Sequence, residues 1–433
     1  MPAIKLGASS ISKVLIGSVP VSRIMLGLQQ IWTARKITSL ALFGDSITDQ
    51  NSTVATSNPN GVLEQSLGYA VNALFLLEHP FDLVERTTSA YVDNGDRDFG
   101  YGSYSAQQLI DGNRSGDGVY PLTDLANADP DDVFVFAGSN PDTDTVGALV
   151  ELWDTFTAAG RRVFAAEILP RGENASGYDG TELANCYTYN VLLKAAAQSR
   201  GIPFLEWADA IALGPGDFAD ESLLNASDHV HPNRRGAELL GARFAAFIEP
   251  FCGAAYSLPV DGDAAWVTIN PYVAGDSSGL ATGFTKTNPA GGTTTASKIS
   301  DGDGTVWQRL VISQPGTYNA VTYRQSSGTS GTFAVGDIVR PVCRVRGDAS
   351  GWDIKAFHII IYDKVATVTT ARNSGMYDYA TSLSSKPTLE VADGLILGPP
   401  YTIKADTTDI YTYFQAWGSA TIDIRQIGLI KVG

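Results

Sequence analysis

The chain has 433 residues, of which 44% are hydrophobic and 18% charged, and its formal net charge is −16 at pH 7. Because a single hydrophobic core stops growing at about 250–300 residues, we expect two sizeable domains. The low charge content and the 10% aromatic content exclude a disordered chain, and the acidity makes nucleic acid a poor partner, since it repels phosphate backbones.

Residues 1–34 carry a repeat with a period of ten, in which glycine closes the apolar stretches 4–7, 14–17 and 24–27. Alternating apolar and polar residues, many of them β-branched, predict short strands joined by turns. Three such units cannot bury a core alone, so we predict an assembly segment that packs on the next domain or on another chain. Lys5 and Lys13 interrupt the apolar residues, and we therefore expect no signal peptide.

Residues 35–252 alternate strand patterns with helix patterns. The buried-strand patterns lie at 37–43, 132–137 and 162–169. The amphipathic helix patterns lie at 69–77, 145–159, 183–200 and 234–248. Strands that alternate with helices predict an α/β domain, in which a parallel sheet has helices on both faces. Ligands of such sheets bind at the carboxyl ends of the strands, so we expect the site there.

Residues 253–433 have a different composition, because helical periodicity fades and Gly, Ser and Thr become dense. Alternating apolar runs lie at 306–312, 354–362, 410–416 and 420–432. They predict a C-terminal all-β sandwich, which is jelly-roll-like. Carbohydrate binding and a structural or oligomerising role both stay open for it. Exposed aromatic side chains would favour sugar binding, and the candidates, each more often a core residue, are Trp266, Trp307, Trp352 and Trp417.

The three cysteines, Cys186, Cys252 and Cys343, are odd in number and widely spaced. They predict buried free thiols rather than a disulfide framework or a zinc site. No ligand cluster has metal-binding spacing, so we expect neither a metal nor another cofactor. No run reaches about 18 apolar residues, so we expect no membrane span.

Ser46 lies in the tetrapeptide Gly44-Asp45-Ser46-Ile47, directly after the first predicted strand. There it would sit at the carboxyl end of the strand, on the turn into a helix, where the helix N-terminus favours developing negative charge. Gly44 lets the chain turn tightly without a side-chain clash. These features make Ser46 a candidate nucleophile, although a helix N-cap serine would fit the tetrapeptide as well.

A histidine pair lies in the stretch 228–233. The segment up to residue 252 contains His79, His229 and His231, and two of these fall here beside Asp228. A nucleophilic serine needs a base, and the base needs an orienting carboxylate. Asp228 and His231 are three apart on a predicted loop, so the carboxylate can reach one imidazole nitrogen while the other faces the serine. His229 is the rival base, but its side chain diverges from that of Asp228. The alternative is that both histidines are surface residues before a helix.

Two further loops could supply donors to an anionic intermediate. Asn140 follows the predicted strand 132–137, where its side-chain amide could donate a hydrogen bond. Gly102 lies in the loop 100–105, where glycine lets a backbone N–H approach a substrate closely. Taken alone, each feature is more typical of a plain turn.

Taken in chain order, four motifs resemble the SGNH (GDSL-type) hydrolase family, over residues 37–250. They are the strand with Ser46, the loop of Gly102, the strand with Asn140, and the stretch with Asp228 and His231. The resemblance implies a flavodoxin-like three-layer α/β/α domain and a serine esterase mechanism without metal. It implies that Ser46 is the nucleophile and that Asp228 and His231 complete a catalytic triad. It also implies an oxyanion hole made of the backbone N–H groups of Ser46 and Gly102 and the amide of Asn140.

Two positions depart from the family pattern. Many relatives have Asp after the asparagine, where this chain has Pro141, and many have Gly after the triad aspartate, where it has His229. Neither change removes a catalytic group, although Pro141 could displace Asn140. Residues 168–171 and 189–190 look like supporting positions of the family.

The repeats of the first 30 or so residues look like those at the front of bacteriophage tail proteins. The whole chain therefore resembles a tail fibre or spike protein that carries an SGNH esterase domain. We predict de-O-acetylation of host surface polysaccharide, a location in the virion tail, a homotrimer, and attachment to other tail proteins through the N-terminus. The alternatives are a non-catalytic receptor-binding tail protein and a bacterial carbohydrate esterase with an attached binding module.

Overall fold

The computed structural model describes most of the chain outside its first 34 residues. The described ranges are 35–54, 62–65, 68–86, 97–140, 142–288, 291–314, 321–325, 333–347, 353–365, 368–377 and 393–432, together with six short strands near the N-terminus.

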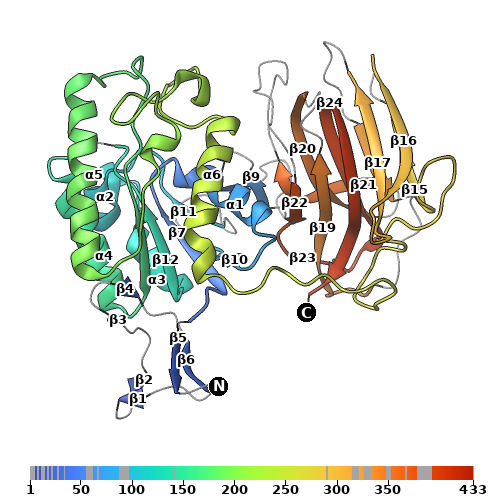
Figure 1. The fold of residues 1–433 in the computed structure, drawn as a ribbon, viewed down its shortest axis with the longest axis horizontal. Helices are drawn as coiled ribbons and strands as arrows, with labels where there is room; N and C mark the ends of the chain where they lie inside the picture. Colours follow the sequence, from blue (N-terminus) through green and yellow to red (C-terminus); the bar gives the residue numbers. More distant parts are fainter. Residues whose placement is uncertain are drawn as a thin grey trace.

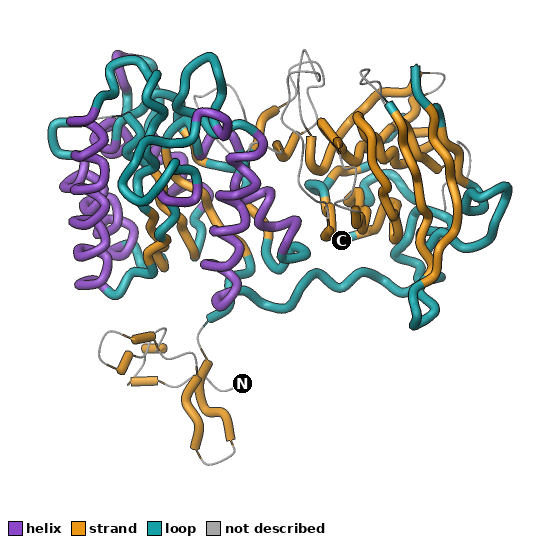
Figure 2. Tube along the Cα trace, turned by 45° about the horizontal axis from the view of Figure 1, so that its top comes forward, coloured by secondary structure: helices purple, strands orange, loops and turns teal. Residues whose placement is uncertain are grey.

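The N-terminal strands form three antiparallel pairs that follow the ten-residue repeat. The pairs are β1 (Lys5–Leu6) with β2 (Ser9–Ser10), β3 (Leu15–Ile16) with β4 (Val19–Pro20), and β5 (Arg23–Leu26) with β6 (Gln29–Thr33). The predicted short strands are therefore present, and Figures 1 and 2 show them apart from the two larger domains.

The first large domain is built on a parallel sheet. Its strands are β7 (Ser39–Gly44), β10 (Asp82–Leu83), β11 (Phe99–Gly100), β12 (Asp132–Phe136), β13 (Arg162–Ala166) and β14 (Phe204–Leu205). β10 and β11 share one edge of β7, and β12, β13 and β14 follow on its other side. With β10 and β11 counted as one position, this order is that of the flavodoxin-like fold.

Helices cover both faces of this sheet (Figure 1). On one face lie α1 (Tyr69–Leu76) and α6 (Arg234–Ile248); on the other lie α2 (Ala106–Asp111), α3 (Pro121–Ala128), α4 (Thr145–Ala158) and α5 (Gly180–Arg200). Strand side chains alternate between the two cores, so Leu40 and Leu42 face α1 and α6 while Ala41 and Phe43 face the others. Because β7 is buried on both faces, its sequence is a continuous apolar run rather than an alternating one. The predicted α/β fold is confirmed.

Short 3-10 helices complete the domain. They span Thr48–Gln50, Arg114–Gly116, Ala208–Ala210, Glu221–Leu223 and Glu249–Phe251. The chain enters and leaves the domain at adjacent points, because Ile37 forms a parallel bridge with Cys252 and donates its N–H to the carbonyl of Phe251 at 2.9 Å.

The C-terminal domain consists of strands, as predicted (Figure 2). They are β15 (Phe284–Lys286), β16 (Thr293–Ser300), β17 (Val306–Ser313), β18 (Val321–Gln325), β19 (Ile338–Gly347), β20 (Asp353–Val365), β21 (Val368–Tyr377), β22 (Asp393–Leu397), β23 (Tyr401–Thr402) and β24 (Thr407–Lys431). Their pairings with one another are antiparallel.

Strand β24 pairs with four other strands of this domain. Its first part pairs with β18 and β20, and its second part pairs with β17 and β19. The two strands predicted at 410–416 and 420–432 are therefore one strand that changes neighbours. Gly418 lies at the change with φ of 110°, and a side chain there would collide with the backbone of Asp353.

Two strands cross from the first domain into the sheet of the second. β8 (Ser52–Val54) and β9 (Val62–Gln65) form a hairpin, and β9 pairs in parallel with β21. Although residues 52–65 fall within the predicted segment 35–252, these strands extend the C-terminal sheet at the order β20-β21-β9-β8.

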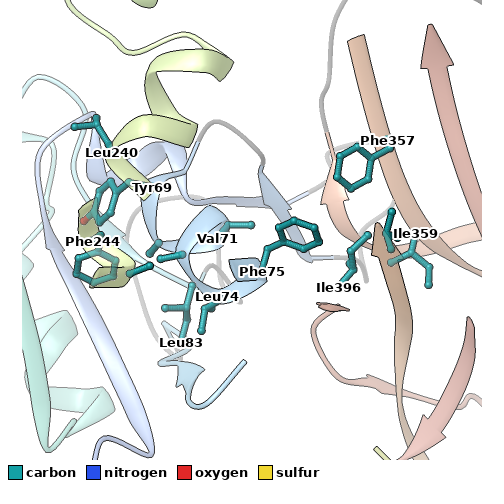
Figure 3. Close-up of a cluster of buried hydrophobic side chains, with 14 of the residues drawn as sticks. Tyr69, Val71, Leu74, Phe75, Leu83, Leu240, Phe244, Phe357, Ile359 and Ile396 are labelled. Atoms are coloured by element: carbon teal, nitrogen blue, oxygen red, sulfur yellow. The ribbon is translucent and has the colours of Figure 1, made fainter. Parts of the chain in front are cut away.

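The two large domains share a hydrophobic core (Figure 3). Phe75 of α1 lies against Phe357 of β20, with ring centroids 6.1 Å apart, and Ile359 and Ile396 belong to the same cluster. Gly394 of β22 packs so closely on α1 that a Cβ there would lie 2.4 Å from the Phe75 carbonyl oxygen.

Polar contacts frame this interface. Arg344 pairs with Glu78 through both guanidinium nitrogens, and Arg340 lies 2.7 Å from the carboxylate of Asp82. The buried His79 accepts a hydrogen bond at Nε2 from the backbone N–H of Leu397 at 3.2 Å. These contacts join the end of α1 and strand β10 to the C-terminal domain.

Several sequence-based expectations concern single residues. All three cysteines are buried and form no disulfide. Trp266 and Trp307 are buried, so neither offers an open ring for sugar stacking; Trp417 is partly exposed, and Trp352 lies outside the described residues. Among the helices that the structure describes, none combines the length and the apolar character needed to span a bilayer.

Candidate active site

Ser46 lies two residues beyond β7, at the carboxyl end of the parallel sheet. The turn leads into a single 3-10 turn at Thr48–Gln50, so the expected helix at this point is one short turn. Gly44 is required for close packing: a Cβ there would lie 1.8 Å from the carbonyl oxygen of Phe136. The end of β7 is therefore pressed against the end of β12.

β7 and β12 are neighbours in the sheet but not in sequence. The order in which strands are added to the sheet reverses here, since β10 and β11 lie on one side of β7 while β12 to β14 lie on the other. At such a switch point the two following loops separate and leave a crevice, which is where open α/β sheets bind ligands. Ser46 follows β7, and Ser139 and Asn140 follow β12, so both loops of this crevice carry predicted site residues.

The structure brings the three predicted triad residues together. His231 Nε2 lies 2.8 Å from Ser46 Oγ, and His231 Nδ1 lies 3.0 Å from Asp228 Oδ2. The second carboxylate oxygen of Asp228 accepts the backbone N–H groups of Val230 and His231, at 2.8 and 3.0 Å. The carboxylate thus holds both the imidazole and the backbone that carries it.

Asn233 fixes the loop that carries these residues. Its side-chain oxygen caps α6 by accepting the N–H groups of Arg235 and Gly236, and its amide nitrogen donates to the carbonyls of Ser222 and Leu224. The sequence motif contained this residue, but its capping role depends on the position of the loop 222–224.

Two carboxylates of the site have shifted pKa values in opposite directions. Burial acts to raise the pKa of Asp228, but the hydrogen bonds from His231 and Val230 outweigh it and hold that pKa below its usual value. Burial raises the pKa of Asp45 despite hydrogen bonds from Ile47 and Ser139. Asp228 therefore stays ionised at neutral pH, as an orienting carboxylate must.

Asp45 ties the serine turn to the loop after β12. Its Oδ1 accepts the N–H of Ile47 at 3.1 Å, and its Oδ2 accepts the N–H of Ser139 at 3.0 Å. On the other side, Arg171 donates to the carbonyl of Ser139. Sequence reasoning gave Asp45 no role, since its partner is far along the chain, but its place within the serine motif was a signal.

The predicted oxyanion donors belong to the serine turn and to the loops after β11 and β12. In the described part of the chain, the backbone N–H groups of Ser46 and Gly102 donate to no protein acceptor. Asn140 donates through Nδ2 to the carbonyl of Tyr104 at 2.9 Å, which leaves the second Nδ2 hydrogen. Pro141, the departure beside Asn140, lies outside the described residues.

The loop of Gly102 is held by one backbone hydrogen bond and by two arginine side chains. The N–H of Tyr101 donates to the carbonyl of Gly44 at 3.0 Å, which places Gly102 next to the serine turn. The buried Arg86 donates to the carbonyl of Gly100 at 3.1 Å, and Arg114 donates to the carbonyl of Gly102 at 3.2 Å. The position of the Gly102 N–H therefore depends on two arginines.

His229 does not contact the serine but forms a second pair with Glu221. Its Nδ1 contacts the Glu221 carboxylate, and its carbonyl accepts the N–H of Gly172 at 2.9 Å. Burial acts to raise the pKa of Glu221, but hydrogen bonds from Asn174 and His229 lower it overall. His229 has φ of 56°, in the left-handed region, which glycine adopts without strain and other residues rarely adopt.

No three His, Cys, Asp or Glu side chains gather into a metal-binding group within the ranges that the structure describes. The arrangement at Ser46 can instead do nucleophilic chemistry: a hydroxyl, a base in contact with it, a carboxylate behind the base, and donors near the hydroxyl.

Comparison with known families is consistent with this chemistry. Residues 42–239, a little under half of the chain, match the GDSL-like Lipase/Acylhydrolase family. The match supports a GDSL-type (SGNH) hydrolase domain there and, with it, an ester hydrolase. No curated protein matches the chain.

Three hydrolases are among the solved structures that are similar to this chain. A GDSL-like lipase from Bacteroides thetaiotaomicron has 17% identity and a TM-score of 0.32, covering 49% of this chain and 88% of its own. A catalytic mutant of an acetylxylan esterase from Geobacillus stearothermophilus has 17% identity and a TM-score of 0.34, with coverages of 49% and 95%. An alpha/beta hydrolase from the metagenome of Lake Arreo has 18% identity and a TM-score of 0.34, with coverages of 51% and 98%.

Proposed function

We propose that this protein is a serine esterase in which Ser46 is the nucleophile, His231 the general base and Asp228 the orienting carboxylate. The observation that carries the proposal is the continuous contact from Asp228 through His231 to Ser46 Oγ, at 3.0 and 2.8 Å. These distances are those required of a base and its nucleophile.

The reaction follows from this geometry. Ser46 Oγ attacks the ester carbonyl carbon while its proton moves to His231 Nε2, and Asp228 stabilises the imidazolium. The N–H groups of Ser46 and Gly102 and the amide of Asn140 stabilise the oxyanion of the tetrahedral intermediate. Collapse breaks the ester C–O bond, and His231 returns the proton to the leaving alcohol.

Water completes the cycle. His231 takes a proton from water as the water oxygen attacks the acyl-enzyme carbonyl. The second intermediate collapses, the carboxylic acid leaves, and the proton returns to Ser46 Oγ. No cofactor takes part in this scheme.

We propose that the substrate is an O-acetylated sugar of a host surface polysaccharide, and that the chain is part of a phage tail. The support is the ten-residue repeat, which forms three short antiparallel pairs, and the all-β C-terminal domain beside the hydrolase domain. The N-terminal segment would attach the protein to other tail proteins, and the tail would present the enzyme at the host surface.

The test of the reaction is acetate release from O-acetylated host-type polysaccharide. We expect release by the wild type and by Ser199→Ala, a surface serine control on α5, and none by Ser46→Ala. If 4-nitrophenyl acetate is cleaved but the polysaccharide is not, the esterase stands and the substrate is wrong. If the wild type cleaves neither ester, the proposed function is wrong.

The proposed trimer is tested by light scattering after size-exclusion chromatography. We expect a mass three times that of the 45.9 kDa chain. A monomer at micromolar concentration would contradict both the trimer and the assembly role of the N-terminal segment.

A further inference from the structure

A cavity of about 240 Å³ lies at the carboxyl ends of β12 and β13, where they meet the first half of α5. Ser139 and Arg171 line it from the loops after these strands, and Glu182, Asn185 and Tyr189 line it from α5. None of these side chains takes part in the chemistry at Ser46.

The cavity is connected to the serine turn through Ser139. The N–H of this residue donates to Asp45, the neighbour of Ser46, and its carbonyl accepts from Arg171. Asn140, the next residue, carries one of the proposed oxyanion donors. A group bound in the cavity would therefore lie against the same loop that faces the ester.

The charges of the wall disfavour an anionic ligand. Among the described residues that line the cavity, Asp142 and Glu182 bring two carboxylates, whereas Arg171 is the single cation and already donates to the carbonyl of Ser139. The Cys186 thiol adds no charge, because burial raises its pKa to about 11. Phosphate or carboxylate groups would meet net repulsion here.

The polar groups of the wall also disfavour an alkyl chain. The wall carries the carboxylate of Glu182 and the side-chain amide of Asn185, both on α5. An alkyl chain would leave such groups unpaired, which is unfavourable, whereas a hydroxylated ligand can both donate to and accept from them. Tyr178 and Tyr189 add aromatic rings against which a ring of C–H groups can pack.

We infer that this cavity is the subsite for a neutral sugar ring, next to the ester that Ser46 attacks. The inference rests on the proposed esterase function and deepens it, because it assigns the alcohol part of the substrate to residues on β12, β13 and α5. The size, the polar wall and the position beside Asn140 all fit a single pyranose ring.

A bulky substitution on α5 that fills the cavity tests the proposed subsite. Asn185 is an exposed residue that lines the cavity, so Asn185→Trp places bulk there without disturbing a core; Val191→Trp, at a position 68% exposed on the same helix and outside the lining, is the matched control. Rates are compared on an O-acetylated methyl pyranoside and on 4-nitrophenyl acetate. We expect Asn185→Trp to lower the ratio of the two kcat/KM values by about tenfold or more, and Val191→Trp to leave it unchanged.

Binding provides a readout that does not need turnover. In saturation-transfer NMR with a panel of unacetylated methyl pyranosides, we expect a signal with the wild type and with Val191→Trp, and its loss in Asn185→Trp. An unchanged rate ratio together with equal binding by both variants would overturn the subsite. If the wild type cleaves neither ester but still binds a pyranoside through this cavity, the esterase proposal fails and the sugar site remains.

Discussion

Asn140 is the proposed oxyanion donor that the surrounding contacts hold most firmly. One Nδ2 hydrogen is used on the carbonyl of Tyr104, and the backbone of the preceding Ser139 is held by Asp45 and Arg171. This arrangement fixes the amide before a substrate arrives, which is what makes such a donor effective in a transition state.

We predict that Asn140→Ala lowers kcat on 4-nitrophenyl acetate by about 10²–10³-fold with a smaller change in KM, because the lost hydrogen bond acts on the transition state. Asn140→Asp, which keeps the shape but brings a negative charge, should be no better. Full turnover by Asn140→Ala would remove this residue from the oxyanion hole.

His229 is held in a left-handed backbone conformation beside the triad aspartate, and its imidazole contacts Glu221. We predict that His229→Ala lowers kcat by about 10-fold to 100-fold, because the loop keeps its backbone strain, loses the contact and lets His231 move. His229→Gly should recover much of this loss, since glycine adopts positive φ without strain.

Steady-state kinetics and urea unfolding of both variants test this role. An alanine variant with wild-type kcat would show that the pair of His229 and Glu221 is a surface contact only. A glycine variant as impaired as the alanine variant would show that the imidazole itself, rather than the backbone, is what positions the loop.

The sequence predicted the residues of the triad because each lies in a local motif: Asp228 and His231 are three apart, and the serine follows a recognisable strand. The contact of Ser46 with His231, 185 residues away, has no local signal of its own. It did not predict the contact of His229 with Glu221, since that depends on how a 3-10 helix folds back on the loop. It left the role of His229 open for the same reason.

At the scale of elements, the helix patterns were predicted well, whereas the shortest strands and several longer strands of the C-terminal domain, among them β16, β19 and β21, were missed. The helix at 234–248 has the predicted bounds, whereas β10, β11 and β14 have two residues each, too few to show a period. β24 was predicted as two strands because Gly418 interrupts the alternation. The pairing of β9 with β21 joins segments far apart in the chain and leaves no local signal.

The contact of α1 and β10 with the C-terminal domain should depend on pH through His79. Burial, together with Arg340 nearby, lowers the pKa of His79 to about 3. In the unfolded chain the pKa of His79 is near 6.5, so the unfolded state binds a proton at a higher pH than the folded state does. The contribution of neutral His79 to the free energy of unfolding is therefore full above about pH 6.5 and is lost as the pH falls toward 3.

We predict that the free energy of unfolding of the wild type falls more steeply between pH 6 and pH 4 than that of His79→Gln, by up to about 1.4 kcal/mol per pH unit. Glutamine can still accept the N–H of Leu397 but does not titrate in this range. Urea unfolding at several pH values measures the difference, and parallel curves for the two proteins would contradict the prediction.

At the scale of the whole molecule, the C-terminal domain contacts the elements that follow both loops that carry the proposed triad. β8 begins six residues after Ser46 and extends the sheet of that domain, and the buried Arg234, three residues after His231, lies 5.5 Å from the ring centroid of Phe357. The hydrolase domain is therefore supported by strands outside its own sheet.

We predict that residues 35–252 alone are less stable than residues 35–433 by about 3–5 kcal/mol, similar to the loss of a buried aromatic side chain, because Phe75 and α1 become exposed. The shorter protein should also lose most of its activity on 4-nitrophenyl acetate. Urea unfolding and kinetics of the two proteins provide the test. Equal stability and activity would show that the interface only joins the domains.

The bridge between Ile37 and Cys252 has a mechanical consequence. Because the chain enters and leaves the hydrolase domain at one point, tension applied between the N-terminal segment and the residues after 252 passes across that short bridge instead of along the parallel sheet. A protein anchored at its front end and pulled at the residues directly after 252 would thus carry the load at this bridge, at the opposite end of β7 from Ser46.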